Sequence, residues 1–305
     1  MISARGVTTA AVVAAMMCVF LVSAASATVN IETVPVGYPG NAPDTTGYGA
    51  VDHNYRIGKY EVTVDQYTEF LNFHHHHSHL SFSPPQYFWN ANHITQSGSG
   101  TTTDPYTYTV APGYANNPVA YVSFWDACRF VNWLGNSQGQ GDGDTESGAY
   151  TLGDYNGSAG GDISRNPGAR WVIPTIDEWY KPAYGNDISN ILSGGSEYFD
   201  DPTTASAYGT VDQYGNGWEW SESVGVANNL STGRILGGGL VAINVDFKGS
   251  SLGDPSKSSG PSLPWVDYVI PSDNGGFGFR VAEVPEPATM SLLALGGLVA
   301  LRRRR

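Results

Sequence analysis

The sequence predicts a single loop-rich α+β domain with few helices, and three observations support this fold class. Three segments combine a capping residue with apolar residues at helical spacing. The remaining apolar segments are short, β-type and separated by long polar stretches. The chain has 38 glycines and 18 prolines among 305 residues, enough for many turns but too few for a low-complexity chain.

Each predicted helix begins with a capping box, in which a hydroxyl side chain and the residue three positions later satisfy free backbone amides. In chain order the pairs are Thr63 with Gln66, Ser123 with Asp126, and Thr175 with Glu178. The predicted strand segments are Tyr55–Val62, Tyr106–Val110, Ala149–Leu152, Gly233–Leu240 and Gly276–Ala282. No repeat with a period of about 20–50 residues occurs, which excludes a solenoid or a propeller.

The N-terminal segment, residues 1–27, has the pattern of a secretory signal peptide. Arg5 precedes an apolar run, and the small residues Ala25 and Ala27 predict cleavage after Ala27. Cys18 would leave with this peptide. The mature chain would then keep Cys128 as its one cysteine, and no intramolecular disulfide would be possible.

The C-terminal segment, residues 284–305, joins a Pro-Glu-Pro tripeptide, a short apolar run and four arginines. The run Ala288–Leu301 is shorter than the roughly 20 residues that a membrane span needs. The segment resembles the PEP-CTERM sorting signal of bacteria; an ordinary tail anchor is the alternative. The resemblance implies transient membrane contact and an exosortase, a membrane protease that cuts near the tripeptide. It also implies release to the cell surface, the outer envelope or the extracellular matrix.

The body between these segments, residues 28–283, is strongly acidic. It carries 10 of the 15 basic and 27 of the 28 acidic residues, a net charge of −17 against −13 for the whole chain. Such a charge argues against a nucleic-acid partner, whose phosphates would be repelled. It is compatible with bound cations and with solubility outside the cell.

Five sequence blocks follow one another in an order that resembles the formylglycine-generating enzyme, or sulfatase-modifying factor, family. The blocks are Ile57–Asn72, Asn117–Leu134, Arg170–Gly185, Tyr214–Trp220 and Phe277–Ala282. The resemblance implies a C-type-lectin-like fold of the formylglycine-generating enzyme type across the body. Trp218 and Trp220 are interpreted as core residues of that fold.

The family's chemistry is where the sequence departs from the resemblance. Family enzymes oxidise a sulfatase cysteine with copper held by two thiolates, and thiolates are the ligands that Cu(I) prefers. The matching stretch here is Gly237–Leu240, and no cysteine follows it. Cys128 lies inside the second predicted helix and is interpreted as a buried, inert thiol. Copper is therefore not expected, and no catalytic residue is assigned.

Calcium is the cofactor that the resemblance does imply. By position, its ligands would be the carboxylates of Asp212 and Glu219 and the backbone carbonyls of Gly215 and Gly217. Oxygen donors on a glycine-rich turn suit Ca²⁺, although Glu219 could instead bind loop amides. Asp200 and Asp201 could contribute to a second calcium site.

Two further motifs are ambiguous. The histidines of His74–His79 suggest a metal site but are interpreted as a solvated loop. Asp142–Glu146 resembles part of a calcium loop but is more simply an acidic turn.

The function expected from the sequence is that of an exported, calcium-stabilised binding module, a pseudoenzyme with a matrix polysaccharide or peptide as ligand. The alternative is an oxidoreductase of the formylglycine-generating type, acting on protein or small-molecule substrates by a route that does not use two cysteines.

Overall fold

The structure, a computed structural model, describes eight segments of the chain. They are residues 29–73, 93–139, 145–152, 163–185, 205–213, 218–227, 230–238 and 277–285.

The helices of the described chain begin where the capping boxes predict them. They are α1 (Val64–Phe73), α3 (Phe124–Gly135) and α4 (Ile176–Tyr184). The Thr175 and Glu178 side chains each bond the other residue's backbone amide, which completes the box at α4. At α3 the Ser123 hydroxyl accepts from the Asp126 amide and donates to the Asp126 carboxylate. Within the described segments, no helix has the length and apolar character needed to cross a membrane.

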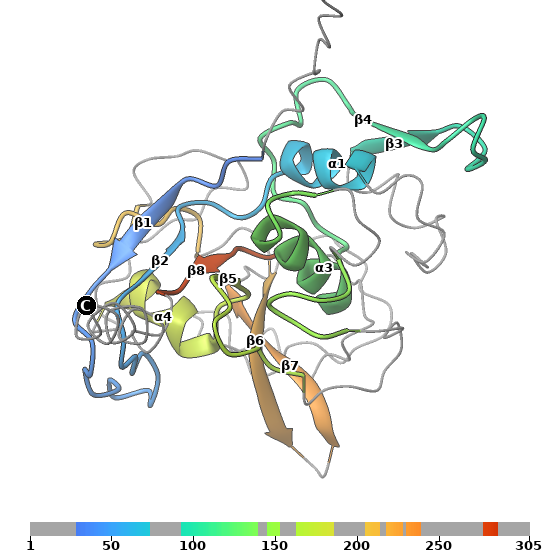
Figure 1. The fold of residues 1–305 in the computed structure, drawn as a ribbon. Coiled ribbons are helices and arrows are strands. Elements are labelled where there is room, and N and C mark those ends of the chain that lie inside the picture. The colour runs from blue at the N-terminus through green and yellow to red at the C-terminus, as the bar shows by residue number, and fades with distance from the viewer. Residues whose placement is uncertain are drawn as a thin grey trace, which may run out of the picture.

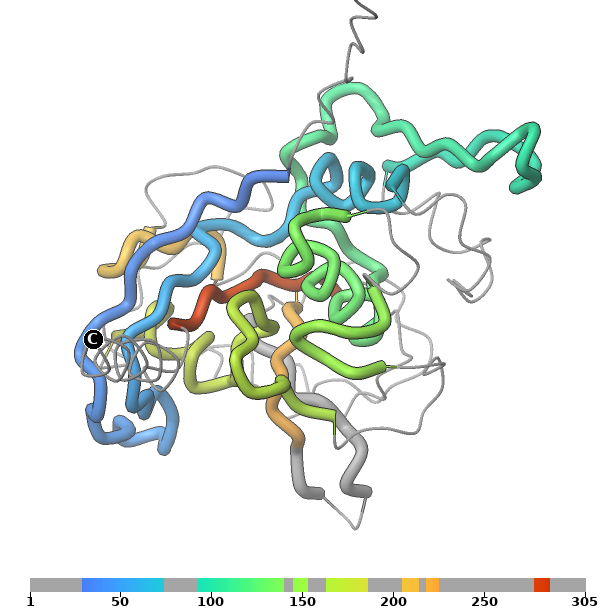
Figure 2. Tube along the Cα trace, viewed as in Figure 1, coloured from blue at the N-terminus to red at the C-terminus, as the bar shows by residue number. Residues whose placement is uncertain are grey.

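The main sheet is antiparallel and has the strand order β1-β2-β8-β5. Its strands are β1 (Thr33–Val36), β2 (Tyr55–Gly58), β5 (Trp171–Val172) and β8 (Ala282–Glu283). Two hairpins pair β3 (Ile94–Ser97) with β4 (Thr107–Val110) and β6 (Trp218–Ala227) with β7 (Leu230–Gly238). The short strand β8 lies near the centre of the molecule (Figure 1), and the β3–β4 hairpin extends away from the rest of the described chain (Figure 2).

This architecture confirms the loop-rich α+β fold with few helices. Two strand predictions are wrong. In Gly276–Ala282, only Ala282 belongs to a strand among the described residues. Ala149–Leu152 is irregular. The Asn132 side chain accepts from the Tyr150 amide at 2.8 Å and donates to the Tyr150 carbonyl at 2.9 Å. A side chain from α3 thus takes the bonds that a neighbouring strand would have supplied.

The segment before β8 positions the largest core cluster and the first candidate site on opposite faces. Phe277, Phe279 and Val281 are buried in that core, together with residues of α1 and α3. The intervening Gly278 pairs with β6, and its amide donates to the Trp218 carbonyl. A Cβ at Gly278 would lie 2.5 Å from the Val119 carbonyl oxygen, so only glycine allows this close approach.

Candidate functional site

A fully buried arginine, Arg280, lies at the centre of the first candidate site. Its Nε and Nη2 donate to the two carboxylate oxygens of Glu219 at 2.7 and 2.8 Å. Nη2 also lies 3.2 Å from Glu61 Oε2, and Nη1 donates to the carbonyls of Gly58 and Lys59. These bonds join β2, β6 and the segment before β8. We call Arg280 with Glu61, Asp212 and Glu219 the Arg280 cluster.

The Arg280 cluster contains more acidic than basic groups. Glu61, Asp212 and Glu219 are 3%, 1% and 0% exposed, and the guanidinium of Arg280 interacts electrostatically with all three. Burial raises the pKa of Glu61 to about 8; Arg280 opposes this rise, and Glu219 and Asp212 add to it. Buried like charges repel, so the cluster favours either a protonated Glu61 or an additional cation.

Two of the four predicted calcium ligands meet at this cluster. The carbonyl that precedes Asp212 and the Oε1 atom of Glu219 both accept from Arg280 Nη2, at 3.2 and 2.8 Å. Asp212 has the left-handed φ of 59°, a conformation that Asp adopts more readily than most residues. Gly215 and Gly217 lie outside the described residues.

The oxygen atoms of the described residues supply only part of a calcium coordination sphere. A carboxylate offers about four lone-pair positions, and Glu219 uses three of them, two for Arg280 and one for the Trp179 indole at 2.9 Å. One position on Oε1 remains. Among the described side chains, no group of three or more His, Cys, Asp or Glu residues could hold a metal ion. A calcium ion at this place would therefore need backbone carbonyls as well.

The thiol of Cys128 is enclosed in the core. The residue lies in α3, is 0% exposed, and shares the largest core cluster with Phe130 and Val131. This confirms the predicted burial. Trp220 is likewise fully buried, and its indole donates to the Val122 carbonyl.

A second buried ion-pair network surrounds Arg165 and fixes the start of α4. The Arg165 guanidinium donates to both oxygens of Glu178, at 2.9 and 2.8 Å, and to Glu222 at 2.6 Å. His53 Nε2 lies 3.0 Å from Glu178. Burial alone would raise the pKa of Glu178, but its bonds with His53 and Arg165 lower it to about 2. The bond to Glu178 raises the pKa of His53.

Sequence reasoning assigned no role to Arg165, Arg280 or Glu61. A usable signal existed for Arg280, which is the one charged residue in the otherwise apolar block Phe277–Ala282. A charge in a buried strand needs a buried partner. Arg165 carries no comparable signal, because the polar residues Ser164 and Asn166 flank it in the sequence.

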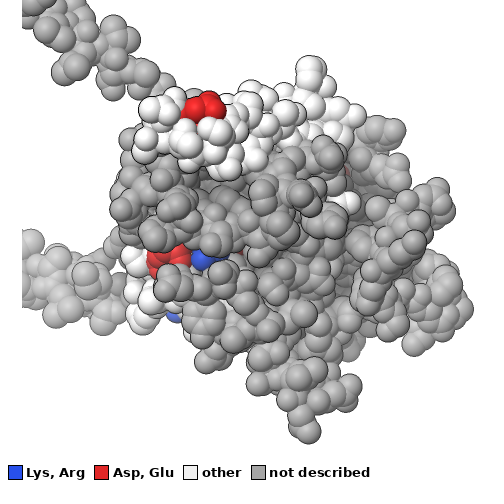
Figure 3. All heavy atoms as spheres, turned by 90° about the vertical axis from the view of Figure 1, so that its right-hand side faces the viewer, with Lys and Arg blue, Asp and Glu red and all other residues white. Residues whose placement is uncertain are grey.

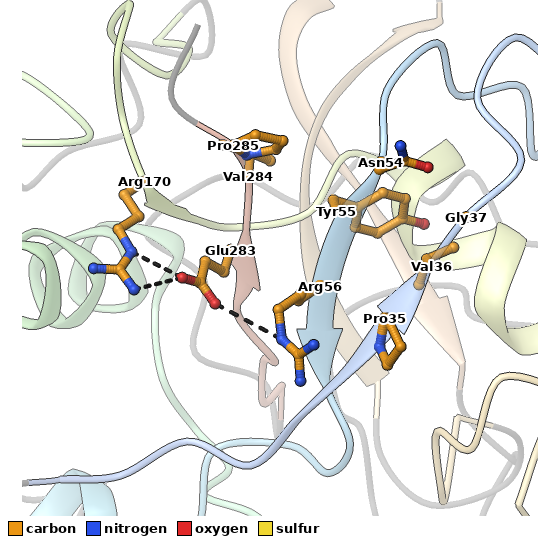
Figure 4. Close-up of a pocket in the computed structure, with 10 residues that line it drawn as sticks. All are labelled: Pro35, Val36, Gly37, Asn54, Tyr55, Arg56, Arg170, Glu283, Val284 and Pro285. Carbon is orange, nitrogen blue, oxygen red and sulfur yellow. Dashed lines mark hydrogen bonds and ion pairs between the residues drawn. The ribbon is translucent and has the colours of Figure 1, made fainter. Parts of the chain in front are cut away.

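A pocket of about 550 Å³ lies at one end of the main sheet, lined by residues of β1, β2 and β8 and by Arg170, which precedes β5 (Figure 4). Its charged residues are Arg56, Arg170 and Glu283. Glu283 accepts two bonds from Arg170, at 2.8 and 2.6 Å, and its other oxygen lies 3.9 Å from Arg56 Nε. Most of the other lining residues are apolar: Pro35, Val36, Tyr55, Val284 and Pro285.

Next to this pocket, Tyr38 presents its ring to solvent. It follows the lining residue Gly37, is 76% exposed and has a φ of 60°. The Lys181 ammonium donates to its carbonyl at 2.7 Å. A positive φ is unfavourable for a bulky residue, and such strain concentrates at binding and catalytic sites.

The ambiguous motifs lie mostly outside the described residues. These are His74–His79, Asp200, Asp201 and residues 142–144. Glu146, at the end of the acidic motif, accepts from Arg129 at 2.7 Å and so belongs to an ion pair. On the face shown in Figure 3, the described surface is mostly uncharged, and neither basic nor acidic residues gather on it.

Comparison with known families shows to which family the domain belongs. The model of the sulfatase-modifying factor enzyme 1-like domain matches residues 41–202, more than half of the chain. The chain therefore belongs to the sulfatase-modifying factor enzyme 1-like family, as its sequence blocks predict. Two of those blocks, Tyr214–Trp220 and Phe277–Ala282, lie beyond the matched range.

The solved structures that are similar to the chain include the following two. Treponema denticola variable protein 1 is 16% identical, with 85% of this chain and 97% of that chain covered and a TM-score of 0.49. The crystal structure of CarF is 18% identical, with 84% and 99% covered and a TM-score of 0.49. No curated protein matches the sequence.

The C-terminal segment matches the PEP-CTERM protein-sorting motif over residues 283–305. This confirms the predicted sorting signal, which indicates export in bacteria and processing by an exosortase. The motif begins at Glu283, the last residue of β8.

Proposed function

We propose that this protein is an exported, non-catalytic binding module of the bacterial cell surface or extracellular matrix. The burial of Cys128 is the observation that carries the proposal. This thiol lies on α3 and is enclosed in the protein core, so it is inaccessible to a protein substrate. The rest of residues 28–283 offers no second thiolate to complete a copper site.

Calcium stabilisation is part of the same proposal. The Arg280 cluster supports it, because three buried carboxylates face one guanidinium. Asp212 and Glu219 would supply side-chain oxygens, and Gly215 and Gly217 would supply carbonyls. A cation bound there would offset the acidic surplus and tie the ends of the loop together.

We infer that Tyr38 is a contact residue for the ligand and that the ligand is an uncharged saccharide of the matrix. An exposed ring held in a strained backbone conformation is a ready contact surface for an amphipathic partner. The net charge of −17 in the body disfavours a polyanionic polysaccharide. A matrix peptide is the competing ligand.

The test uses the processed protein and the neutral polysaccharide isolated from the producing cells. Tyr38→Ala should weaken co-sedimentation about fivefold, because one aromatic contact contributes about 1 kcal/mol. Tyr114→Ala is the matched control, since Tyr114 is also exposed but lies elsewhere, stacked on His93. Equal binding by the two variants would remove Tyr38 from the site. Aldehyde formation on a cysteine-containing sulfatase peptide with added copper would overturn the non-catalytic proposal.

A further inference from the structure

The pocket at the end of the main sheet is lined in part by the sorting motif itself. Glu283, Val284 and Pro285 belong to both the pocket and the matched motif. Figure 4 shows Glu283 between Arg56 and Arg170, with Val284 and Pro285 beside them. A cut in the chain just after Pro285 would therefore create a new chain end next to this pocket.

The backbone upstream of Pro285 is held in the fold. Ala282 and Glu283 pair with β2 on one side and β5 on the other. The Val284 amide donates to the Arg170 carbonyl at 2.8 Å. A protease needs backbone that it can draw out of the structure, so a cut that leaves the domain folded falls after Pro285.

The pocket has a surplus of positive charge. The side chains of Arg56 and Arg170 are 46% and 62% exposed, while that of Glu283 is 21% exposed. Within the described part of the chain, neither arginine uses its Nη1 atom in a hydrogen bond. Two guanidiniums that face one carboxylate have donor groups left to bind a second carboxylate.

The nearest source of that carboxylate is the chain. Residues 286 and 287 complete the Pro-Glu-Pro tripeptide, and two residues extend at most about 7 Å. A cut after Pro285, Glu286 or Pro287 would thus leave the new terminus within about 7 Å of a lining residue. A tethered group also has a high effective concentration, which an external ligand would have to exceed.

We propose that the pocket between Arg56 and Arg170 binds the carboxylate that processing creates at the new C-terminus. Hydrolysis of one peptide bond consumes a water molecule, leaves the carboxylate on the domain and an amine on the released segment. The mature end is then docked on the sheet from which it emerges. This inference does not depend on the saccharide ligand or on calcium.

The test begins with intact-mass measurement of the processed protein purified from the exporting cells. The expected mass corresponds to a chain that ends at Pro285, Glu286 or Pro287 with a free carboxylate. A terminus upstream of Pro285, a terminus far downstream, or a mass increase from a group joined to the carboxylate would each overturn the proposal.

The second measurement is an NMR titration of the ¹³C-labelled terminal carboxyl group. Pairing with arginine should hold its pKa below about 3, whereas an ordinary terminal carboxyl titrates at about 3.3–3.7. Arg170→Gln should return the pKa to that range. Lys59→Gln is the matched control, because Lys59 is a partly exposed cation paired with Glu32 and does not line the pocket. An identical pKa in the wild type and in Arg170→Gln would overturn the proposal.

Discussion

The buried ion pair and hydrogen bonds of Arg280 connect distant segments at the centre of the domain. Arg280 bonds Glu219 from β6 and two carbonyls at the end of β2, across as many as 222 positions of sequence. A buried pair of this kind contributes little net stability compared with an apolar pair. Removing one partner, however, strands the other charge and costs about 3–5 kcal/mol. Glu219 therefore has a structural role whether or not it also binds calcium.

This double role determines how the calcium proposal is tested at the residue scale. Asp212→Gly removes a predicted ligand and fits the left-handed φ of 59°. In wild-type protein, a calcium chelator should lower the melting temperature, and in Asp212→Gly the same chelator should have little effect. Ser137→Gly is the matched control, since Ser137 is exposed and has a φ of 61°. A wild-type transition that the chelator leaves unchanged would rule out the site.

At the scale of elements, the start of α4 shows how one side chain serves several segments. Glu178 closes the capping box with Thr175, accepts two bonds from Arg165 and contacts His53. Through Arg165 the helix is connected to Glu222 of β6. The position of α4 thus depends on an ion-pair network as well as on the apolar cluster of Trp179 and its neighbours.

Glu178→Gln should destabilise the protein by about 3 kcal/mol at pH 7, because the pKa of Glu178 is lowered from 4.5 to about 2. A lowered carboxyl pKa stabilises the fold above the unfolded value and loses this effect as the pH falls through the folded value. The difference between variant and wild type should therefore shrink between pH 4.5 and pH 2, as measured by urea denaturation. Glu32→Gln is the exposed-pair control and should cost less than about 1 kcal/mol. A constant difference across this pH range would contradict the assignment.

The helices were more predictable from sequence than the strands, for a local reason. A capping box lies within four residues, so Thr63, Ser123 and Thr175 mark the helix starts directly. The strands β5 and β8 have two residues each and exist only through partners far away in the sequence. The same limit applies to the sites, because Glu61 meets Glu219 and Arg280 only in the folded chain.

At the scale of the whole molecule, β8 joins β2 to β5 and comes after both in the sequence. Ala282 is fully buried in the cluster that contains Ile57 and Val172. The main sheet is therefore incomplete without its final strand, even though that strand has only two residues.

A chain ending at Val281 should fail to give a cooperative thermal transition, because β2 and β5 lose their shared partner and Ala282 is absent. A chain ending at Pro285 keeps every strand and should melt cooperatively, as followed by circular dichroism. The two chains differ by four residues, so they form a matched pair. A cooperative transition in the shorter chain would show that β8 is dispensable.

The late arrival of β8 bears on how such a protein would cross the cell envelope. During N-to-C translocation, β1, β2 and β5 emerge before β8. The main sheet can therefore form completely only after β8 has emerged. The sorting motif begins at Glu283, the last residue of β8, so the strand that completes the sheet emerges together with the start of this motif. The processing enzyme would then meet a folded domain in which the chain up to Val284 is held by backbone hydrogen bonds, which protects the body from being cut too early.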